Sequence, residues 1–293
     1  MIAKLAVLAA FGALVVATTQ GCEPQEEKEQ AVFLGTHESW DYAPAMNQVA
    51  ERFRGTEGVV LHVGDSITFA APYTAWARRG AGKTPEDEAI LEWSHCGAEN
   101  ELDGWHLASR EVGDFWSYTA AGGIRADQYI AGGYGGMAAL DEIVRKYNPQ
   151  VAIVMLGTND AWQGRSINAY AADMAKILHR LLDNGTVPIL STIPQMVPAW
   201  ELGEQYNREI WRLAEKHQLP VIDFYGEIEA RQPEGAWNGT LLNKDDPHPT
   251  AERVGVTPES EPTPNNLRES GYLLRGRLSV KKLSEVKQRV WGE

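Results

Sequence analysis

The stretch "LHVGDSITFA", residues 61 to 70, decides how the rest of the chain is interpreted. An apolar run ends abruptly at Gly64-Asp65-Ser66 and resumes at Ile67. Gly, Asp and Ser are common turn residues, so the stretch can mark nothing more than the end of a strand. A turn at this point can also lift a nucleophilic serine into a cleft. The second interpretation requires a base, an acid that orients the base, and donors for an oxyanion elsewhere in the chain.

Apolar runs alternate with helical patterns along the chain. We expect buried strands at 58–64, 151–156, 187–192 and 219–224, with a weaker fifth at 115–120. We expect helices at 44–54, 137–148, 166–185 and 204–218, and a last one near the C-terminus, at about 266–290. Short buried strands that alternate with amphipathic helices predict a parallel sheet covered by helices on both faces.

Polar residues follow the ends of three of these strands. Ser66 follows the strand at 58–64, "GTND" (157–160) follows the strand at 151–156, and "DDPHPT" (245–250) comes after the strand at 219–224. Ligands of open α/β sheets bind beyond the carboxyl ends of the strands, so we expect these segments to meet there. A serine hydroxyl becomes a good nucleophile when a nearby imidazole takes its proton, and a carboxylate orients that imidazole. His248 is the candidate base, and Asp245 and Asp246 are both candidates for the orienting acid.

The motifs "GDSI", "GTND" and "DDPH" resemble, in order, the first, third and fifth sequence blocks, or motifs, of the SGNH, or GDSL-type, hydrolase family. The resemblance covers roughly residues 57 to 290. It implies a flavodoxin-like α/β fold, a three-layer α/β/α sandwich around a central parallel five-stranded sheet. It also implies a serine esterase that works through an acyl-enzyme without metal or cofactor, with a catalytic triad of Ser66, His248 and Asp245. The family spacing favours Asp245 over its rival Asp246.

The resemblance also implies an oxyanion hole. Its donors would be the Ser66 N–H, the Asn159 side-chain amide and a backbone N–H from the family's second block. In this chain the corresponding segment is "TAAGGIRADQ" (119–128), which departs from the family pattern because Ala126 stands where the donor glycine is expected. The third donor is therefore assigned to Gly123, which has no side chain, with Ala126 as the alternative.

The N-terminus is typical of an exported protein. Lys4 precedes an uncharged apolar run at residues 5–17, which is too short to span a membrane comfortably and has the size of a secretory signal. "TTQGC" (18–22) resembles a bacterial lipoprotein signal and implies lipidation of Cys22, with an ordinary cleavage site nearby as the alternative. We expect a signal peptide at 1–21 and a tether and N-terminal extension at 22–43.

The remaining 44–293 segment is expected to be one domain, with insertions at about 80–113 and 251–265. The protein would be periplasmic, membrane-anchored or secreted. A net charge of -13 argues against nucleic-acid binding, so contact with a membrane would involve only the signal peptide or a lipid anchor. No metal is expected, because the spacing of His95, Cys96 and His106 fits no known ligand set.

The tryptophans bear on the substrate. Trp162 directly follows "GTND" and is expected on the rim of the site, where Trp93, Trp105 and Trp200 would join it in a platform for sugar rings. The leading hypothesis is hydrolysis of acetyl or similar short-chain esters of carbohydrates. A long-chain lipase, lysophospholipase or thioesterase is the alternative, and a non-catalytic, surface-anchored binding module is the alternative from another class.

Overall fold

A computed structural model describes residues 38–109, 117–197 and 199–292 of the chain. Residues 35–293 form one compact unit. The predicted signal peptide, the cysteine at position 22 and most of the predicted tether lie outside the described residues. No helix among the described residues is both long and apolar enough to cross a lipid bilayer.

The centre of the domain is a parallel sheet of four strands in the order β1-β2-β3-β4. Its strands are β1 (Val60–Gly64), β2 (Val151–Met155), β3 (Val187–Ser191) and β4 (Val221–Ile222). Every residue of these strands is buried, as is usual for a parallel sheet covered on both faces. The strand predictions at 58–64, 151–156 and 187–192 are confirmed to within two residues.

The predicted fifth strand at 115–120 is reduced, among the described residues, to a single parallel bridge between Ala120 and Gly64 at the outer side of β1. Residues 115 and 116 lie outside the described part of the chain. The Ser117 hydroxyl donates to the Ala120 carbonyl at 2.6 Å and accepts from the Ala120 N–H at 2.8 Å. These local bonds occupy backbone groups that a longer ladder would need. With Ala120 counted as a strand position, the order corresponds to the flavodoxin-like 2-1-3-4-5.

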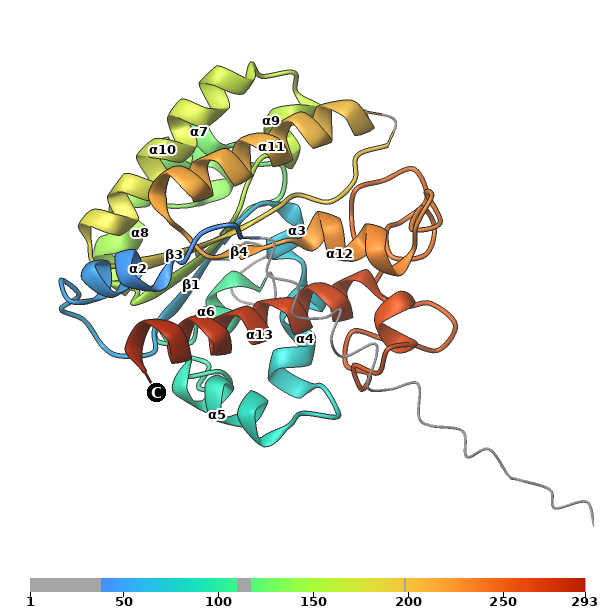
Figure 1. Cartoon of the computed structure of the whole chain (residues 1–293), viewed down its shortest axis with the longest axis horizontal. Coiled ribbons are helices and arrows are strands. Elements are labelled where there is room, and N and C mark those ends of the chain that lie inside the picture. The colour runs from blue at the N-terminus through green and yellow to red at the C-terminus, as the bar shows by residue number, and fades with distance from the viewer. Residues whose placement is uncertain (1–37, 110–116, 198, 293) are drawn as a thin grey trace, which may run out of the picture. The chain divides into compact units, whose positions relative to one another are not determined.

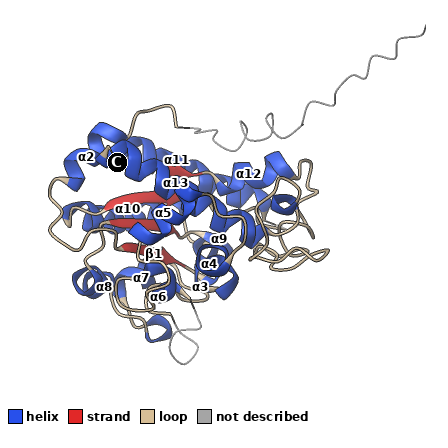
Figure 2. Cartoon of the chain, turned by 90° about the horizontal axis from the view of Figure 1, so that it is seen from below, coloured by secondary structure: helices blue, strands red, loops and turns tan. Residues whose placement is uncertain are grey.

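Two layers of helices cover the sheet, as Figures 1 and 2 show. One layer contains α7 (Ala126–Ala131), α8 (Leu140–Tyr147), α10 (Ile167–Asp183) and α11 (Trp200–His217). The other is built around α13 (Gly271–Trp291), which packs on α2 (Ala43–Ala50), α4 (Ala71–Arg79) and α5 (Pro85–Trp93). Shorter helices lie at strand ends or in connections: α3 (Ser66–Phe69), α6 (Gly104–Ala108), α9 (Thr158–Trp162) and α12 (Phe224–Arg231). The predicted three-layer α/β/α architecture is therefore correct.

The strand predicted at 219–224 contains only Val221 and Ile222, because Asp223 turns the chain into α12 and caps that helix. The edge of β4 is covered by residues assigned to the N-terminal extension. Glu38 Oε1 accepts the Val221 N–H at 2.8 Å, and Trp40 donates to the Leu219 carbonyl at 3.1 Å. The predicted domain start at residue 44 is therefore too late, because residues from 38 onward seal the free edge of the sheet.

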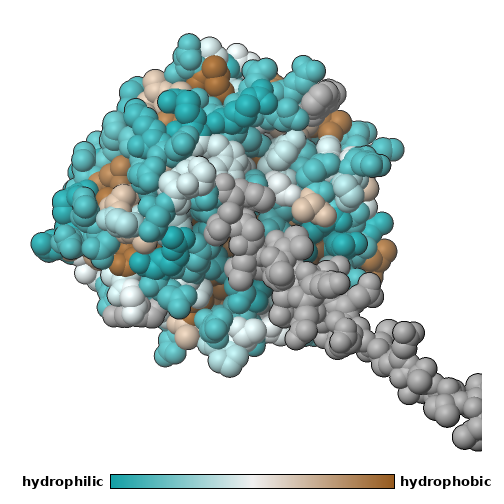
Figure 3. Space-filling model, in the orientation of Figure 1, coloured by the Kyte–Doolittle hydropathy of each residue, from teal (hydrophilic) through white to brown (hydrophobic). Residues whose placement is uncertain are grey.

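The two predicted insertions differ in structure. The segment 80–113 contains α5 and α6, and Thr84 and Asp87 form a capping box at the start of α5. The segment 251–265 contains neither a helix nor a strand, only a tight turn bridged between Arg253 and Val256. The surface seen in Figure 3 is largely hydrophilic, with small and separate hydrophobic areas. The apolar side chains of the described residues are mostly in the interior.

Candidate active site

Ser66 is the first residue of α3, directly beyond the carboxyl end of β1. The buried Asp65 caps this four-residue helix, and its Oδ1 accepts the Ile67 N–H at 3.0 Å. Gly64 is required by a close approach, since a Cβ at this position would lie 2.0 Å from Thr68 Oγ1. The turn that ends the strand thus presents the serine at the N-terminus of a helix, where backbone N–H groups have no intrahelical acceptor.

The side chains of Ser66 and His248 meet although they are 182 residues apart in sequence. Ser66 Oγ lies 2.7 Å from His248 Nε2. The chain around His248 is held by a backbone hydrogen bond of 2.9 Å from Asn243 N to the His248 carbonyl and by a bridge between Leu242 and Pro249. The structure therefore brings together the predicted nucleophile and the predicted base.

The acid beside His248 is Asp246, so the assignment of Asp245 is wrong. Asp246 Oδ1 lies 2.5 Å from His248 Nδ1 and also accepts the His248 backbone N–H at 2.7 Å. Asp245 has φ of +57° and exchanges two hydrogen bonds with Asn238, of 2.8 and 3.0 Å. Asp adopts this left-handed backbone conformation more readily than most residues. The Asp245 side chain is directed to Asn238, and Asp246 is the acid that faces the imidazole. Since the carboxylate accepts the Nδ1 proton, Nε2 is the nitrogen that accepts the Ser66 hydroxyl.

Asn159 lies on α9, beyond the carboxyl end of β2, as predicted. Its amide donates to Asp65 Oδ2 at 3.2 Å, so the acid next to the serine also holds the asparagine. Burial raises the pKa of Asp65, while the Ile67 N–H and the nearby Arg275 guanidinium oppose this shift. The Asp65 carboxylate thus connects the first and third motifs.

The second motif approaches Ser66 through two glycines. A Cβ built on Gly122 would lie 3.9 Å from Ser66 Cβ, so the Gly122–Gly123 peptide is beside the serine. Gly123 has φ of +83°, and a Cβ there would lie 2.6 Å from the Tyr134 hydroxyl. Within the described ranges, the N–H groups of Ser66, Gly122 and Gly123 make no hydrogen bond to the protein.

The alternative assignment of the third oxyanion donor to the Ala126 N–H is wrong. Its N–H already donates to Asp160 Oδ2 at 3.0 Å, and the residue is fully buried at the start of α7. Proximity to Ser66 is instead a property of Gly122, which the sequence comparison did not single out. The feature of the sequence that indicates this approach is the pair of adjacent glycines. Without side chains between them, two loops at strand ends can lie close together.

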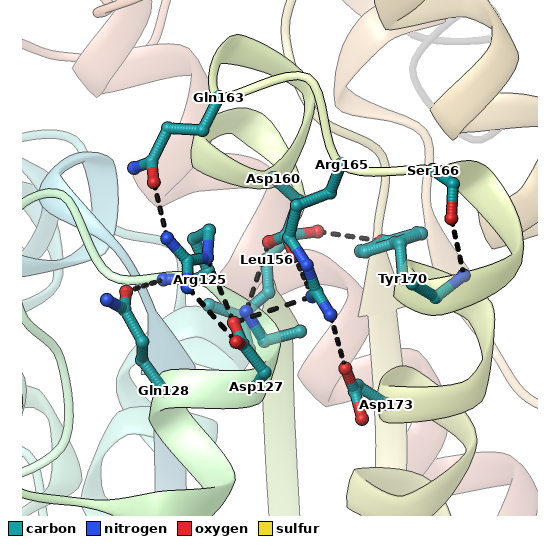
Figure 4. Close-up of polar contacts among 12 residues, drawn as sticks. Arg125, Asp127, Gln128, Leu156, Asp160, Gln163, Arg165, Ser166, Tyr170 and Asp173 are labelled. Atoms are coloured by element: carbon teal, nitrogen blue, oxygen red, sulfur yellow. Dashed lines mark hydrogen bonds and ion pairs between the residues drawn. The ribbon is translucent and has the colours of Figure 1, made fainter.

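A network of charged side chains joins α7, α9 and α10, as Figure 4 shows. The buried Asp160 accepts from Arg165 at 2.6 Å, and Arg165 also contacts Asp173 at 2.7 Å and Asp127 at 3.5 Å. Arg125 pairs with Asp127 at 3.0 Å. The network fixes the start of α7 against α9, and thereby the second motif against Asn159. Asp160 thus has a partner in α7 as well as in its own loop.

Two of the four tryptophans assigned to the aromatic platform pack elsewhere, and the side chain of a third, Trp200, is outside the described part of the structure. Trp162 lies on α9 three residues after Asn159, and its exposed fraction is 56%. Trp105 is fully buried and packs on His62 and Tyr73, so its assignment to the platform is wrong. Trp93, also assigned to the platform, packs against a residue at the end of α13, Trp291. These two rings of the insertion therefore pack against β1, α4 and α13.

The other histidine and cysteine side chains of the described residues include one close pair, His179 and His217, with ring centroids 5.3 Å apart. Among the described residues, no group of three or more His, Cys, Asp or Glu side chains is arranged to hold a metal ion. Burial raises the pKa of the Cys96 thiol to about 12, which makes it a poor nucleophile. Burial, assisted by the Arg275 charge, lowers the pKa of His62 to about 3, so this histidine in β1 is neutral.

The chain is similar to several solved structures. The chain aligns with a GDSL-like lipase from Bacteroides thetaiotaomicron at 16% identity and a TM-score of 0.49, covering 84% of this chain and 99% of that one. It aligns with an acetylxylan esterase from Geobacillus stearothermophilus at 15% identity and a TM-score of 0.48, covering 79% and 96%. A lipase/acylhydrolase from Enterococcus faecalis gives 17% identity and a TM-score of 0.48, over 77% and 95%. No curated protein matches the chain by sequence.

The chain also matches a protein family. Residues 62–252 match the GDSL-like lipase/acylhydrolase family, a span that includes Ser66, Asn159 and His248. This span runs from the strand before the serine to the loop after the histidine. The chain therefore belongs to the GDSL-like lipase/acylhydrolase family of ester-hydrolysing enzymes.

Proposed function

We propose that this enzyme hydrolyses carboxylic esters through an acyl-enzyme on Ser66, with His248 as general base and Asp246 as the acid that orients it. The observation that carries the proposal is the 2.7 Å contact between Ser66 Oγ and His248 Nε2, with Asp246 on the opposite ring nitrogen. A serine hydroxyl, an imidazole and a carboxylate in this sequence of contacts are what nucleophilic acyl transfer requires.

In the first half of the reaction, Ser66 Oγ attacks the ester carbonyl while its proton passes to His248 Nε2. Asp246 stabilises the imidazolium that forms. The tetrahedral intermediate collapses when the C–O bond to the alcohol breaks and His248 returns the proton to the leaving oxygen. Water then attacks the acyl-enzyme with His248 again as base, which releases the carboxylic acid and restores the serine.

The oxyanion needs preorganised donors. The Asn159 amide carries two N–H bonds, of which one is used by Asp65, so the other is available for the intermediate. The Ser66 N–H at the start of α3 and the N–H of Gly123 complete the proposed set. The Asp160 network holds Asn159 and the glycine loop in register, so the donors need little rearrangement during the reaction.

For the substrate, we propose short acyl esters, such as acetyl esters, of carbohydrates. The support is the position of Trp162, a broad exposed ring three residues from a proposed oxyanion donor. A tryptophan presents a flat apolar face that can stack on a sugar ring while its surroundings stay wet. The next residue, Gln163, is hydrogen-bonded to Arg125 at 2.5 Å, so polar groups are present at the end of the same helix.

The reaction is tested by p-nitrophenyl acetate hydrolysis with the wild type and Ser66→Ala. We expect the variant to lose activity by at least about a thousandfold, because removal of a triad member leaves only the binding and oxyanion contributions. A serine-directed phosphonate should label Ser66 in the folded wild type. Equal hydrolysis by both proteins would reject the proposed mechanism, and failure of the phosphonate to label would favour a non-catalytic binding module.

The substrate class is tested separately with p-nitrophenyl esters of graded chain length and with acetylated oligosaccharides. We expect the highest kcat/KM at two to four carbons. Trp162→Ala should raise KM for acetylated oligosaccharides without changing p-nitrophenyl acetate hydrolysis. A maximum at eight carbons or longer would instead favour a long-chain lipase, lysophospholipase or thioesterase.

We also propose that the protein is exported and anchored through a lipid on Cys22. The charged start, the apolar run at 5–17 and the Gly21-Cys22 pair support this proposal. Expression of the full chain and of Cys22→Ser in a bacterial host, with labelled palmitate, tests it. We expect label in the membrane fraction only for the wild type, and equal labelling of both would exclude lipidation at this cysteine.

A further inference from the structure

A buried arginine lies beneath the nucleophile. Arg275, on α13, is only 2% exposed, although a buried guanidinium is costly unless its donors are satisfied. Nη1 donates to the Ile67 carbonyl at 2.6 Å, and Nη2 donates to Thr68 Oγ1 at 2.7 Å. Both contacts are to α3, the helix that begins with Ser66.

These contacts reach the C-terminal end of α3. The helix has four residues and stops at Ala70, which is extended. The last carbonyls of a helix lack intrahelical donors, and a cation at this end also interacts favourably with the helix dipole. Arg275 meets both needs through the Ile67 carbonyl. Thr68 Oγ1, its second acceptor, occupies the space that the missing Cβ of Gly64 leaves.

Arg275 is itself held rigidly. Its guanidinium lies over the ring of Tyr73, 3.8 Å from the centroid. The Tyr73 hydroxyl lies 3.1 Å from Ser279 Oγ and 3.0 Å from His62 Nδ1, and Ser279 donates to the Arg275 carbonyl at 3.0 Å. The stack on Tyr73, whose hydroxyl is itself held by hydrogen bonds, and the two bonds from the Nη atoms to α3 leave the guanidinium little freedom to rotate.

We propose that Arg275 is a positioning residue that fixes α3 so that Ser66 Oγ stays directed at His248 Nε2. This inference rests on the proposed role of Ser66 as nucleophile. Asp65 holds the N-terminal end of α3 and, through Asn159, the third motif. Arg275 holds the other end from the C-terminal helix. With one end released, a four-residue helix can tilt, and a displacement of about 1 Å at a reacting atom costs on the order of a hundredfold in rate.

The test compares Arg275→Met with Arg277→Met in the full domain. Arg277 is a matched control, because it is a second buried arginine on α13, paired with Asp87 and lying over the Trp76 ring, 4.8 Å from its centroid. Its removal should destabilise the same helix without touching α3. The readouts are kcat and KM for p-nitrophenyl acetate, the rate of Ser66 labelling by a phosphonate, and thermal unfolding to define conditions in which each variant is folded.

We expect Arg275→Met to lower kcat and the labelling rate at least about tenfold, with KM changed less than about threefold, because the reacting geometry changes and the binding contacts do not. Arg277→Met should stay within about twofold of the wild type in all three. Equal kcat and labelling for the two folded variants would overturn the inference.

A second pair keeps the test decisive if Arg275→Met does not fold. Thr68→Val removes one acceptor of Arg275 while conserving shape, and Thr68→Ser retains the hydroxyl. We expect Thr68→Val to lower kcat at least about threefold and Thr68→Ser to behave as wild type. Equal activity of this pair would contradict the inference. An unlabelled and inactive wild type would instead reject the proposed function, so the two failures are distinguishable.

Discussion

Substitution of Asp246 by Asn gives the sharpest test of the site geometry. The change keeps the shape of the side chain but removes the negative charge beside His248 Nδ1. The amide can also present its N–H to the ring, which would favour the tautomer with the proton on Nε2. In that tautomer His248 cannot accept the Ser66 proton.

The magnitude follows from the exposure of the pair. The Asp246 side chain is 47% exposed and the His248 side chain is 39% exposed, so water screens their interaction partly. Two unit charges 4 Å apart interact by about 1 kcal/mol in water and about 4 kcal/mol near a protein surface. With the tautomer effect added, we expect the transition state to lose about 2–4 kcal/mol, which corresponds to about 30- to 1,000-fold in kcat. A fully buried triad would lose about ten-thousandfold.

The assay measures kcat and kcat/KM for p-nitrophenyl acetate with Asp246→Asn and Asp245→Asn side by side. Asp245→Asn is the matched control, because Asn tolerates the left-handed backbone and its carbonyl oxygen can still accept from Asn238. We expect this variant to retain activity within about threefold. A larger loss for Asp245→Asn than for Asp246→Asn would restore the assignment drawn from the motif spacing, and no loss for either would refute an acid partner for His248.

Three other substitutions test separate parts of the structure. Asn159→Ala should lower kcat by about a hundredfold or more through loss of an oxyanion donor, and thermal unfolding of the same protein controls for folding. Gly123→Ala should lower the free energy of unfolding by about 1–2 kcal/mol, because Gly123 has φ of +83° and an added Cβ would clash with the Tyr134 hydroxyl. Adding Tyr134→Phe should relieve this clash but not the backbone strain. Urea unfolding of the single and the double variant measures both effects. Burial opposes ionisation of Asp87, but hydrogen bonds at the start of α5 and the Arg277 pair outweigh it and lower its pKa. The pair therefore stabilises the fold above the unfolded pKa of about 4, and this stability is lost as pH falls through the lower folded value. The difference in unfolding free energy between wild type and Asp87→Asn should be about 3 kcal/mol at pH 7 and smaller at pH 3, and a constant difference would contradict the lowered pKa.

Local patterns in the sequence were sufficient to predict the architecture. Buried runs such as 151–156 and amphipathic segments such as 166–185 became β2 and α10 with small shifts at their ends. The positions of Ser66 and Asn159 directly after such runs were enough to place both side chains at one edge of the sheet, because parallel strands end on the same side. The predicted strands were too long where a side chain, such as that of Ser117 or Asp223, forms hydrogen bonds with the backbone in place of regular strand pairing.

The details of the site depended on contacts between distant segments. The spacing of Asp245 and Asp246 from His248 allowed either acid to be its partner, and the choice was made by a left-handed residue and its bonds to Asn238. Arg275, whose acceptors are more than 200 residues away, had no local signal of a role at the nucleophile.

The sequence by itself determined the order of strands and helices, the serine on its turn and the chemistry available at the strand ends. These follow from hydrophobic period and turn chemistry, which act over a few residues. Only the tertiary structure decided which carboxylate faces the imidazole, that Ala126 gives its N–H to Asp160, and that α13 holds the nucleophile helix from below. These contacts depend on the directions of side chains from separate elements, and packing sets those directions only when the elements meet.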